Sequence, residues 1–209
     1  MTEQNNNNQL LVDNAEYLEV GIHIGTKAKS PGMKQFVYKI REDGLYLLNL
    51  DTINERIGTA AKMLARYEPK DIVVTASRIY AISAASKFAE IISAKFMPGR
   101  VMPGIFTNSN RADYTEPGII LMSDSRNERQ AIREASKTSI PVIALSDTDN
   151  WIKFVDLIIP CNNKGRRSLA LVYFLLAREY MKEKGLIKSN DDFKYKISDF
   201  EAKVEMKAK

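Results

Sequence analysis

Residues 118–123 read Gly-Ile-Ile-Leu-Met-Ser, with four apolar side chains in an unbroken run. Ile72-Val73-Val74 is a second such run, again without the alternation of apolar and polar residues seen in a strand with one wet face. Unbroken apolar runs of this length are typical of strands buried on both faces, and therefore of a parallel sheet covered by helices on each side. The two stretches predict an α/β fold.

The rest of the chain fits this architecture. Four strands alternate with helices, and we expect the strands at 71–76, 118–123, 141–145 and 155–159 and the helices at 78–94, 126–137 and 168–182. Upstream, we expect a short helix at 10–20, two strands at 36–40 and 45–50 joined by a turn, and a helix capped by Asp51 or Thr52. The predicted fold is a three-layer α/β/α sandwich.

The length of 209 residues and the hydrophobic content of 44% suit one folded core. We expect a flexible, asparagine-rich segment at 1–9, a single domain at 10–185, and a mixed-charge tail at 186–209 that becomes ordered only on a partner. The polar start lacks the apolar core of a signal peptide, and the longest apolar run, 168–177, is about half of a membrane span. A single cysteine, Cys161, excludes an intramolecular disulfide and fits a reducing cytoplasm.

The charges are segregated along the chain. Three stretches, 26–41, 95–111 and 161–178, hold 12 of the 31 basic residues and none of the 26 acidic ones. Surfaces that bind phosphates need such acid-free basic segments, because each neutralised phosphate releases a counterion. Solvated loops would give the same pattern, but three separate stretches favour a nucleic-acid partner.

Motifs for catalysis and cofactors are missing. Ser77-Arg78-Ile79-Tyr80 follows the first long strand without the glycines of a dinucleotide-binding fingerprint, and the phosphate loop of nucleotide hydrolases is absent as well. One histidine and one cysteine cannot build a structural zinc site. We therefore expect no enzymatic activity, cofactor, metal or small-molecule substrate.

Two catalytic alternatives remain open. His23 and Cys161 could form a nucleophile pair, although His23 lies between two isoleucines and is more simply a packed, hydrogen-bonded residue at a helix end. Asp51, Asp124 and Lys164 each follow a strand and could meet at the carboxyl edge of the sheet, as in a response-regulator receiver that binds magnesium and is phosphorylated on aspartate. The competing interpretation makes both aspartates helix caps.

Two segments are candidates for phosphate contact. Gly165-Arg166-Arg167-Ser168 stands where the last helix begins, so free backbone amides, the helix dipole and two arginines would act together. The loop 97–111 has cations near its ends, several glycines and prolines, and neutral donors such as Asn108. Alternatively, Met102 and Phe106 only pin this loop to the core.

Residues that carry a family resemblance run in order from about Val12 to Gly185. They are Gly21-Ile22-His23-Ile24-Gly25-Thr26, Phe36-Val37-Tyr38-Lys39, Asp43-Gly44-Leu45-Tyr46, Gly99-Arg100, Pro103-Gly104, Phe106-Thr107-Asn108, Asp124-Ser125-Arg126, Glu134-Ala135, Ile140-Pro141, Ala144-Leu145, Ile159-Pro160-Cys161-Asn162-Asn163-Lys164-Gly165 and Leu176-Ala177-Arg178-Glu179. No single piece is specific, but the ordered set resembles the small-subunit ribosomal protein S-two family, whose eukaryotic member is known as ribosomal protein SA.

The resemblance implies a mainly parallel, five-stranded, flavodoxin-like sheet and no enzymatic activity. It implies binding to small-subunit ribosomal RNA and to neighbouring ribosomal proteins, in the cytoplasm, where the head of the subunit meets its body. Bacterial members carry a long helical hairpin where only Ala112 to Thr115 stands here, and eukaryotic members continue into an acidic extension beyond the position of Lys209. The archaeal form is therefore the expected match.

The leading hypothesis is a structural RNA-binding protein of the small ribosomal subunit that supports translation and subunit assembly. A phosphorylatable receiver and an RNA-binding module outside the ribosome are the alternatives. The expected RNA contacts lie in the acid-free stretches and are Lys27, Lys29, Lys34, Arg100, Asn108, Arg111, Lys164, Gly165, Arg166 and Arg167.

Overall fold

The computed structural model describes residue 11, residues 14–190 and residues 192–202. The expected flexible segment 1–9 and the end of the tail lie outside the described residues. Five strands form one parallel sheet in the order β4-β3-β5-β6-β7, with the bounds β3 Ile72–Ala76, β4 Lys95–Pro98, β5 Ile119–Met122, β6 Val142–Ser146 and β7 Leu157–Pro160. Counted along these five strands the order is 2-1-3-4-5, the doubly wound order of flavodoxin. The predicted α/β/α sandwich is confirmed.

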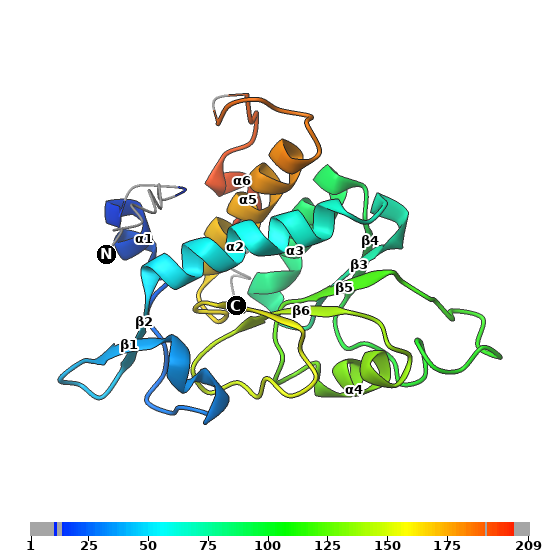
Figure 1. Cartoon of the computed structure of the whole chain (residues 1–209), viewed down its shortest axis with the longest axis horizontal. Coiled ribbons are helices and arrows are strands. Elements are labelled where there is room, and N and C mark those ends of the chain that lie inside the picture. Colours follow the sequence, from blue (N-terminus) through cyan, green and yellow to red (C-terminus); the bar gives the residue numbers. More distant parts are fainter. Residues whose placement is uncertain (1–10, 12–13, 191, 203–209) are drawn as a thin grey trace, which may run out of the picture.

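Helices cover both faces of the sheet. One face is covered by α2 (Leu50–Ala65), α3 (Ile79–Ile92) and α5 (Arg166–Glu183), and the other by α4 (Arg129–Lys137) (Figure 1). Alternate residues of the strands enter two separate cores: Val74 and Leu121 pack under the three helices, while Val73 and Ile120 pack on the side of α4. The apolar runs are unbroken because each strand supplies both cores.

The face under α4 is completed by a loop. Val101, Ile105 and Phe106, from the segment between β4 and β5, are buried in the same core as α4. Glu134 of α4 accepts hydrogen bonds from the backbone N–H of Gly104 at 2.9 and 3.0 Å. Phe106 therefore anchors the loop to the core, as the alternative interpretation had it, whereas Met102 is exposed.

The N-terminal segment lies beside the sheet and shares the core under α2, α3 and α5. It contains α1 (Asn14–Val20), a 3-10 helix (Gly32–Phe36) and an antiparallel hairpin of β1 (Val37–Ile40) and β2 (Tyr46–Leu48). The Ser30 N–H donates to the Thr148 carbonyl at 2.8 Å, and the Asn162 side chain donates to the Gly21 carbonyl at 3.3 Å. A Cβ at Gly25 would lie 2.4 Å from Cγ2 of Thr148, so this approach requires glycine.

Two local expectations were wrong. The helix α2 is capped by Asn49, whose side chain accepts a hydrogen bond from the Asp51 N–H at 2.9 Å, and not by Asp51 or Thr52. No strand was expected at Lys95–Pro98, because Met97 and Pro98 were assigned to the loop 97–111; the structure has the short edge strand β4 there. Only one side of an edge strand needs ladder hydrogen bonds, so a proline is tolerated there.

Part of the tail packs on the body of the domain. Phe200, at the end of α6 (Ile197–Phe200), is fully buried and meets Phe174 of α5 edge-on, with ring centroids 6.0 Å apart. Phe193 meets the same ring at 5.3 Å. Ordering of the tail only on the ribosome stays a prediction, and this packing supplies a way to test it in the free protein.

We expect Phe200→Ala to lower the free energy of unfolding of the free protein by about 3 kcal/mol, because it removes a buried aromatic ring. Chemical denaturation measures this, with Leu186→Ala as the control, since Leu186 is 67% exposed in the same tail. Equal free energies for the natural protein and Phe200→Ala would mean that the tail is detached until the chain meets its partner.

Candidate nucleic-acid interface

Acids and bases at the carboxyl edge of the sheet are paired with one another. Lys164, after β7, lies 3.1 Å from Asp147 Oδ2 and 2.9 Å from Asp149 Oδ1, and Arg126 lies 2.8 Å from the other oxygen of Asp149. Burial raises the pKa of Asp147, against the charge of Lys164. Burial would also raise the pKa of Asp149, but hydrogen bonds and charges from Lys164 and Arg126 lower it. The Lys164 ammonium is thus neutralised locally.

Asp124, which follows β5, is also fully engaged by donors of the protein itself. Its fully buried carboxylate accepts hydrogen bonds from Arg78 Nε at 2.7 Å, the Arg126 N–H at 2.9 Å and Asn150 Nδ2 at 3.1 Å. The bond from Arg126 closes a turn ahead of α4, whose N-cap position is Glu128, so Asp124 does not cap a helix as one interpretation had it. Three donors from three directions leave this carboxylate little capacity to bind a metal or accept a phosphoryl group.

Glu128 fills the place where doubly wound folds hold their ligands. This place is the crevice between β3 and β5, at which the strand order reverses. The Glu128 carboxyl group is buried there and accepts hydrogen bonds from the Thr75 hydroxyl and, at 3.0 Å, from the Ser77 N–H. Burial raises its pKa to about 7. A side chain of the protein itself therefore occupies the base of the crevice.

The residues of the two catalytic alternatives do not form the sites that those alternatives require. Asp124 and Lys164 lie at the carboxyl edge as expected, but Asp51 is an exposed residue of α2, which follows the hairpin and not the five-stranded sheet. Burial raises the pKa of the Cys161 thiol, which is opposite to what a nucleophile needs, and no hydrogen bond joins it to His23 among the described residues. Within the same residues, no group of three or more histidine, cysteine or acidic side chains could hold a metal.

The candidate cations fall into two groups. Arg111 forms a two-armed ion pair with Asp113 at 2.7 and 2.8 Å, Arg166 lies 3.3 Å from Glu201 of the tail, and Lys164 is paired as described. The other group is exposed and forms no ion pair with any described residue: Lys27, Lys29, Lys34, Arg100 and Arg167. Asp113 and Glu201 stand outside the acid-free stretches, which is why composition alone missed these pairs.

At the expected phosphate site before α5, two backbone N–H groups already donate hydrogen bonds to a side chain of the protein. Asn162 Oδ1 accepts hydrogen bonds from the N–H groups of Lys164 and Gly165, both at 3.1 Å. In the loop after β4, Asn108 is exposed and its side chain accepts from the Asn110 N–H at 3.1 Å. RNA contact by Gly165 and Asn108 stays a prediction.

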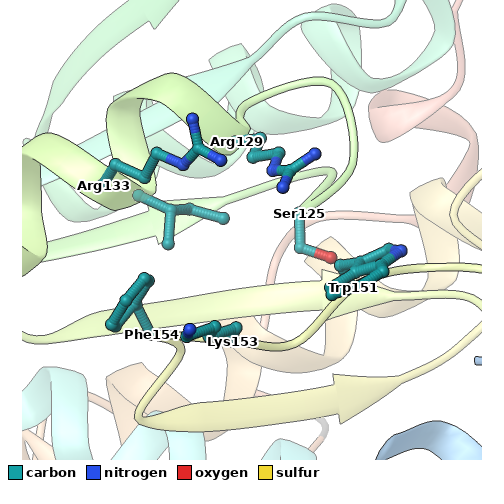
Figure 2. A pocket seen from close by; sticks show the side chains of 7 residues that line it. Ser125, Arg129, Arg133, Trp151, Lys153 and Phe154 are labelled. Carbon is teal, nitrogen blue, oxygen red and sulfur yellow. The ribbon is translucent and has the colours of Figure 1, made fainter. Parts of the chain in front are cut away.

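One cluster was not anticipated from the sequence. Arg129 and Arg133 of α4 lie on one side of a pocket, and Trp151, Lys153 and Phe154 of the loop after β6 lie on the other (Figure 2). The arginines are four residues apart and so share a helix face, which the sequence could have indicated. Their meeting with Trp151 depends on tertiary structure.

The fold and the site define a class: a flavodoxin-like α/β domain with a buried carboxyl group in its ligand crevice and basic surface loops. The family model "Ribosomal protein S2" matches residues 111–182. A protein named small ribosomal subunit protein uS2 from Thermoplasma acidophilum is 50% identical over 94% of this chain and 98% of its own length. Proteins of the same name from Saccharolobus solfataricus and Staphylothermus marinus are 47% and 46% identical, over 94% and 93% of this chain and 85% and 89% of their own lengths.

The chain therefore belongs to the ribosomal protein S2 family, and its relatives are of the archaeal type. Family membership confirms the expected cytoplasmic ribosomal protein without enzymatic activity. None of the described helices has the length and apolar character that a membrane crossing requires.

The buried Glu128 predicts a pH dependence. Because its pKa is about 7 in the fold against an ordinary value of 4.5, its contribution to stability is fully present below about pH 4.5 and is lost as the pH rises through 7. Glu128→Gln should reduce the fall in unfolding free energy between these pH values by up to about 3 kcal/mol. Denaturation at several pH values measures this, with the exposed Glu183→Gln as control. An unchanged profile in Glu128→Gln would contradict the assignment.

The two arginines of the loop after β4 should have different roles, with Arg111 stabilising the loop and Arg100 binding a partner. Arg111→Ala breaks the pair with Asp113 and a hydrogen bond to the Pro103 carbonyl, so we expect it to loosen the loop in hydrogen exchange. Arg100→Ala should leave hydrogen exchange unchanged but lower incorporation into small subunits, because Arg100 is exposed and unpaired among the described residues. The reverse pattern would remove Arg100 from the binding surface.

Proposed function

We propose that this chain binds small-subunit ribosomal RNA through exposed cations on the loops around the carboxyl edge, and that it supports subunit assembly and translation as a structural component. The observation that carries the proposal is the division of the candidate cations. The edge's own acids engage Lys164, Arg126 and Arg78, while five cations on the surrounding loops, in the 3-10 helix and at the start of α5 remain exposed.

Only the exposed group is suited to bind a polyanion strongly. A cation already paired with a carboxylate adds little net charge, whereas an unpaired one neutralises a phosphate and releases a counterion. Lys27, Lys29 and Lys34 lie on or beside a loop that the Ser30–Thr148 hydrogen bond fixes against the loop after β6. The lysines are therefore presented on a braced segment, which reduces the entropy lost on binding.

The exposed group spans the whole edge. Arg100 follows β4 and Arg167 follows β7, and these are the two outer strands of the sheet. Four inter-strand spacings of about 4.8 Å separate the outer strands by about 19 Å. A surface of that width suits a folded RNA that offers several phosphates at once.

The relatives named above are small-subunit proteins by name, and the family resemblance implies a place where the head meets the body. We propose the same location for this chain, with other small-subunit proteins as neighbours. The alternative is an RNA-binding module outside the ribosome. A sucrose gradient of cell lysate distinguishes the two, because only a ribosomal protein co-sediments with small subunits in near-equal amounts.

The triple variant Lys27→Ala, Lys34→Ala and Arg100→Ala should weaken binding to transcribed small-subunit RNA and lower the salt slope by up to about three units. The control is Lys62→Ala, Arg66→Ala and Lys194→Ala, which removes the same charge from exposed positions on α2 and the tail. Filter binding over a range of salt concentrations measures both. Equal losses of RNA affinity in the two variants would mean that only net charge matters, and would refute the assigned surface.

A further inference from the structure

The pocket under α4 has a composition different from that of the carboxyl edge. Its volume is about 150 Å³, and Ser125 and Ile132 complete its lining. Trp151 is 59% exposed and Phe154 is 49% exposed, so two large rings face solvent within a few residues of each other. Figure 2 shows both rings on the loop side, across the pocket from Arg129 and Arg133. Exposed aromatic residues gathered in this way often mark binding surfaces.

The rings are held in place by the loop and by cations. Phe154 has a φ of 66°, a left-handed backbone conformation that is uncommon for an aromatic residue. The Lys153 ammonium lies 5.0 Å from the centre of the Phe154 ring, and the Arg129 guanidinium lies 5.6 Å from the centre of the Trp151 ring. The loop keeps Phe154 at the surface despite the conformational cost.

The pocket is positively charged. Its lining includes Arg129, Arg133 and Lys153 and no acid, and none of these cations forms an ion pair with a residue that the structure describes. The acids nearest to these cations along the chain accept hydrogen bonds elsewhere: Glu128 from Thr75 and the Ser77 N–H, Glu134 from the Gly104 N–H, and Asp156 from the Val142 N–H. An occupant should therefore carry negative charge beside a flat apolar group.

We propose that this pocket binds an unpaired nucleotide of RNA, whose base stacks on Trp151 or Phe154 while its phosphate contacts Arg129 and Arg133. Bases stack on exposed aromatic rings only when they are free of a helix, so single-stranded or flipped-out nucleotides are the matching ligand. The inference rests on the proposed function and adds a second, stacking contact to the phosphate-binding loops.

The position of the pocket supports this assignment. Its loop continues from Thr148, which binds the lysine-rich segment, and a Cβ at Gly32 of that segment would lie 2.4 Å from the Ile152 side chain. The pocket is thus joined to the proposed RNA surface by direct packing. A strand of RNA on the lysine loop could continue into it without leaving the protein.

Trp151 is the single tryptophan of the chain, so its fluorescence reports on this pocket alone. We expect a short single-stranded oligoadenylate to quench it saturably, and a blunt RNA duplex of equal length to quench it far less. Phe154→Ala should weaken oligoadenylate binding by about 5- to 150-fold, the range that alanine substitution of stacking residues gives.

The two arginines of the pocket are tested separately. Arg129→Ala with Arg133→Ala should lower the salt slope of oligoadenylate binding by about 1.4. Lys62→Ala with Arg66→Ala is the matched control, and unfolding midpoints verify that each variant is folded.

Oligoadenylate that binds without changing Trp151 emission, and equally well to the pocket variants, would overturn this inference and leave RNA binding by the loops intact. Failure of both oligoadenylate and small-subunit RNA to bind would remove the proposed function as well. Quenching by RNA-free small-subunit proteins but not by RNA would assign the pocket to a protein partner, and would also overturn the inference.

Discussion

A buried carboxylate needs a cation, a set of donors or a proton, and this requirement organises the carboxyl edge of the sheet. Asp124 and Asp147 are buried and have Arg78 and Lys164 beside them, while Glu128 has donors and a raised pKa. The result is an edge whose buried carboxyl groups are paired or hydrogen-bonded within the protein. A crevice that holds a small ligand in other proteins of this topology has here become part of the scaffold.

The two faces of the sheet are covered by different numbers of helices, and the loop after β4 therefore both completes a core and presents a cation. Three helices cover one face, but α4 alone cannot cover the other, so Ile105 and Phe106 complete that core. The exposed Arg100 therefore belongs to a loop that is anchored by the buried side chains of Val101, Ile105 and Phe106. A loop anchored in this way presents its cation in a nearly fixed position, and less conformational entropy is lost when a partner binds.

The sequence predicted the features that depend on neighbouring residues. Apolar runs and their alternation with helical stretches predicted four of the five parallel strands, and the order of short motifs indicated the family. Features that depend on distant residues were missed: Arg166 meets Glu201 of the tail, and the arginines of α4 meet Trp151 only when the fold is complete. Arg111 shows the limit most clearly, because its partner Asp113 stands just beyond the stretch that composition marked as acid-free.

The docking of the N-terminal segment has a consequence for the order of folding. Thr26 and Gly21 bind Thr148 and Asn162, partners that follow them by 122 and 141 positions. Contacts of such separation form late, because a long loop must close first. The sheet can grow strand by strand from β3, but the lysine-rich segment gains its support only after β6 and β7 are in place. Half-folded chains therefore lack the braced lysines, so the surface that we propose to bind RNA is complete only on molecules whose folding is complete.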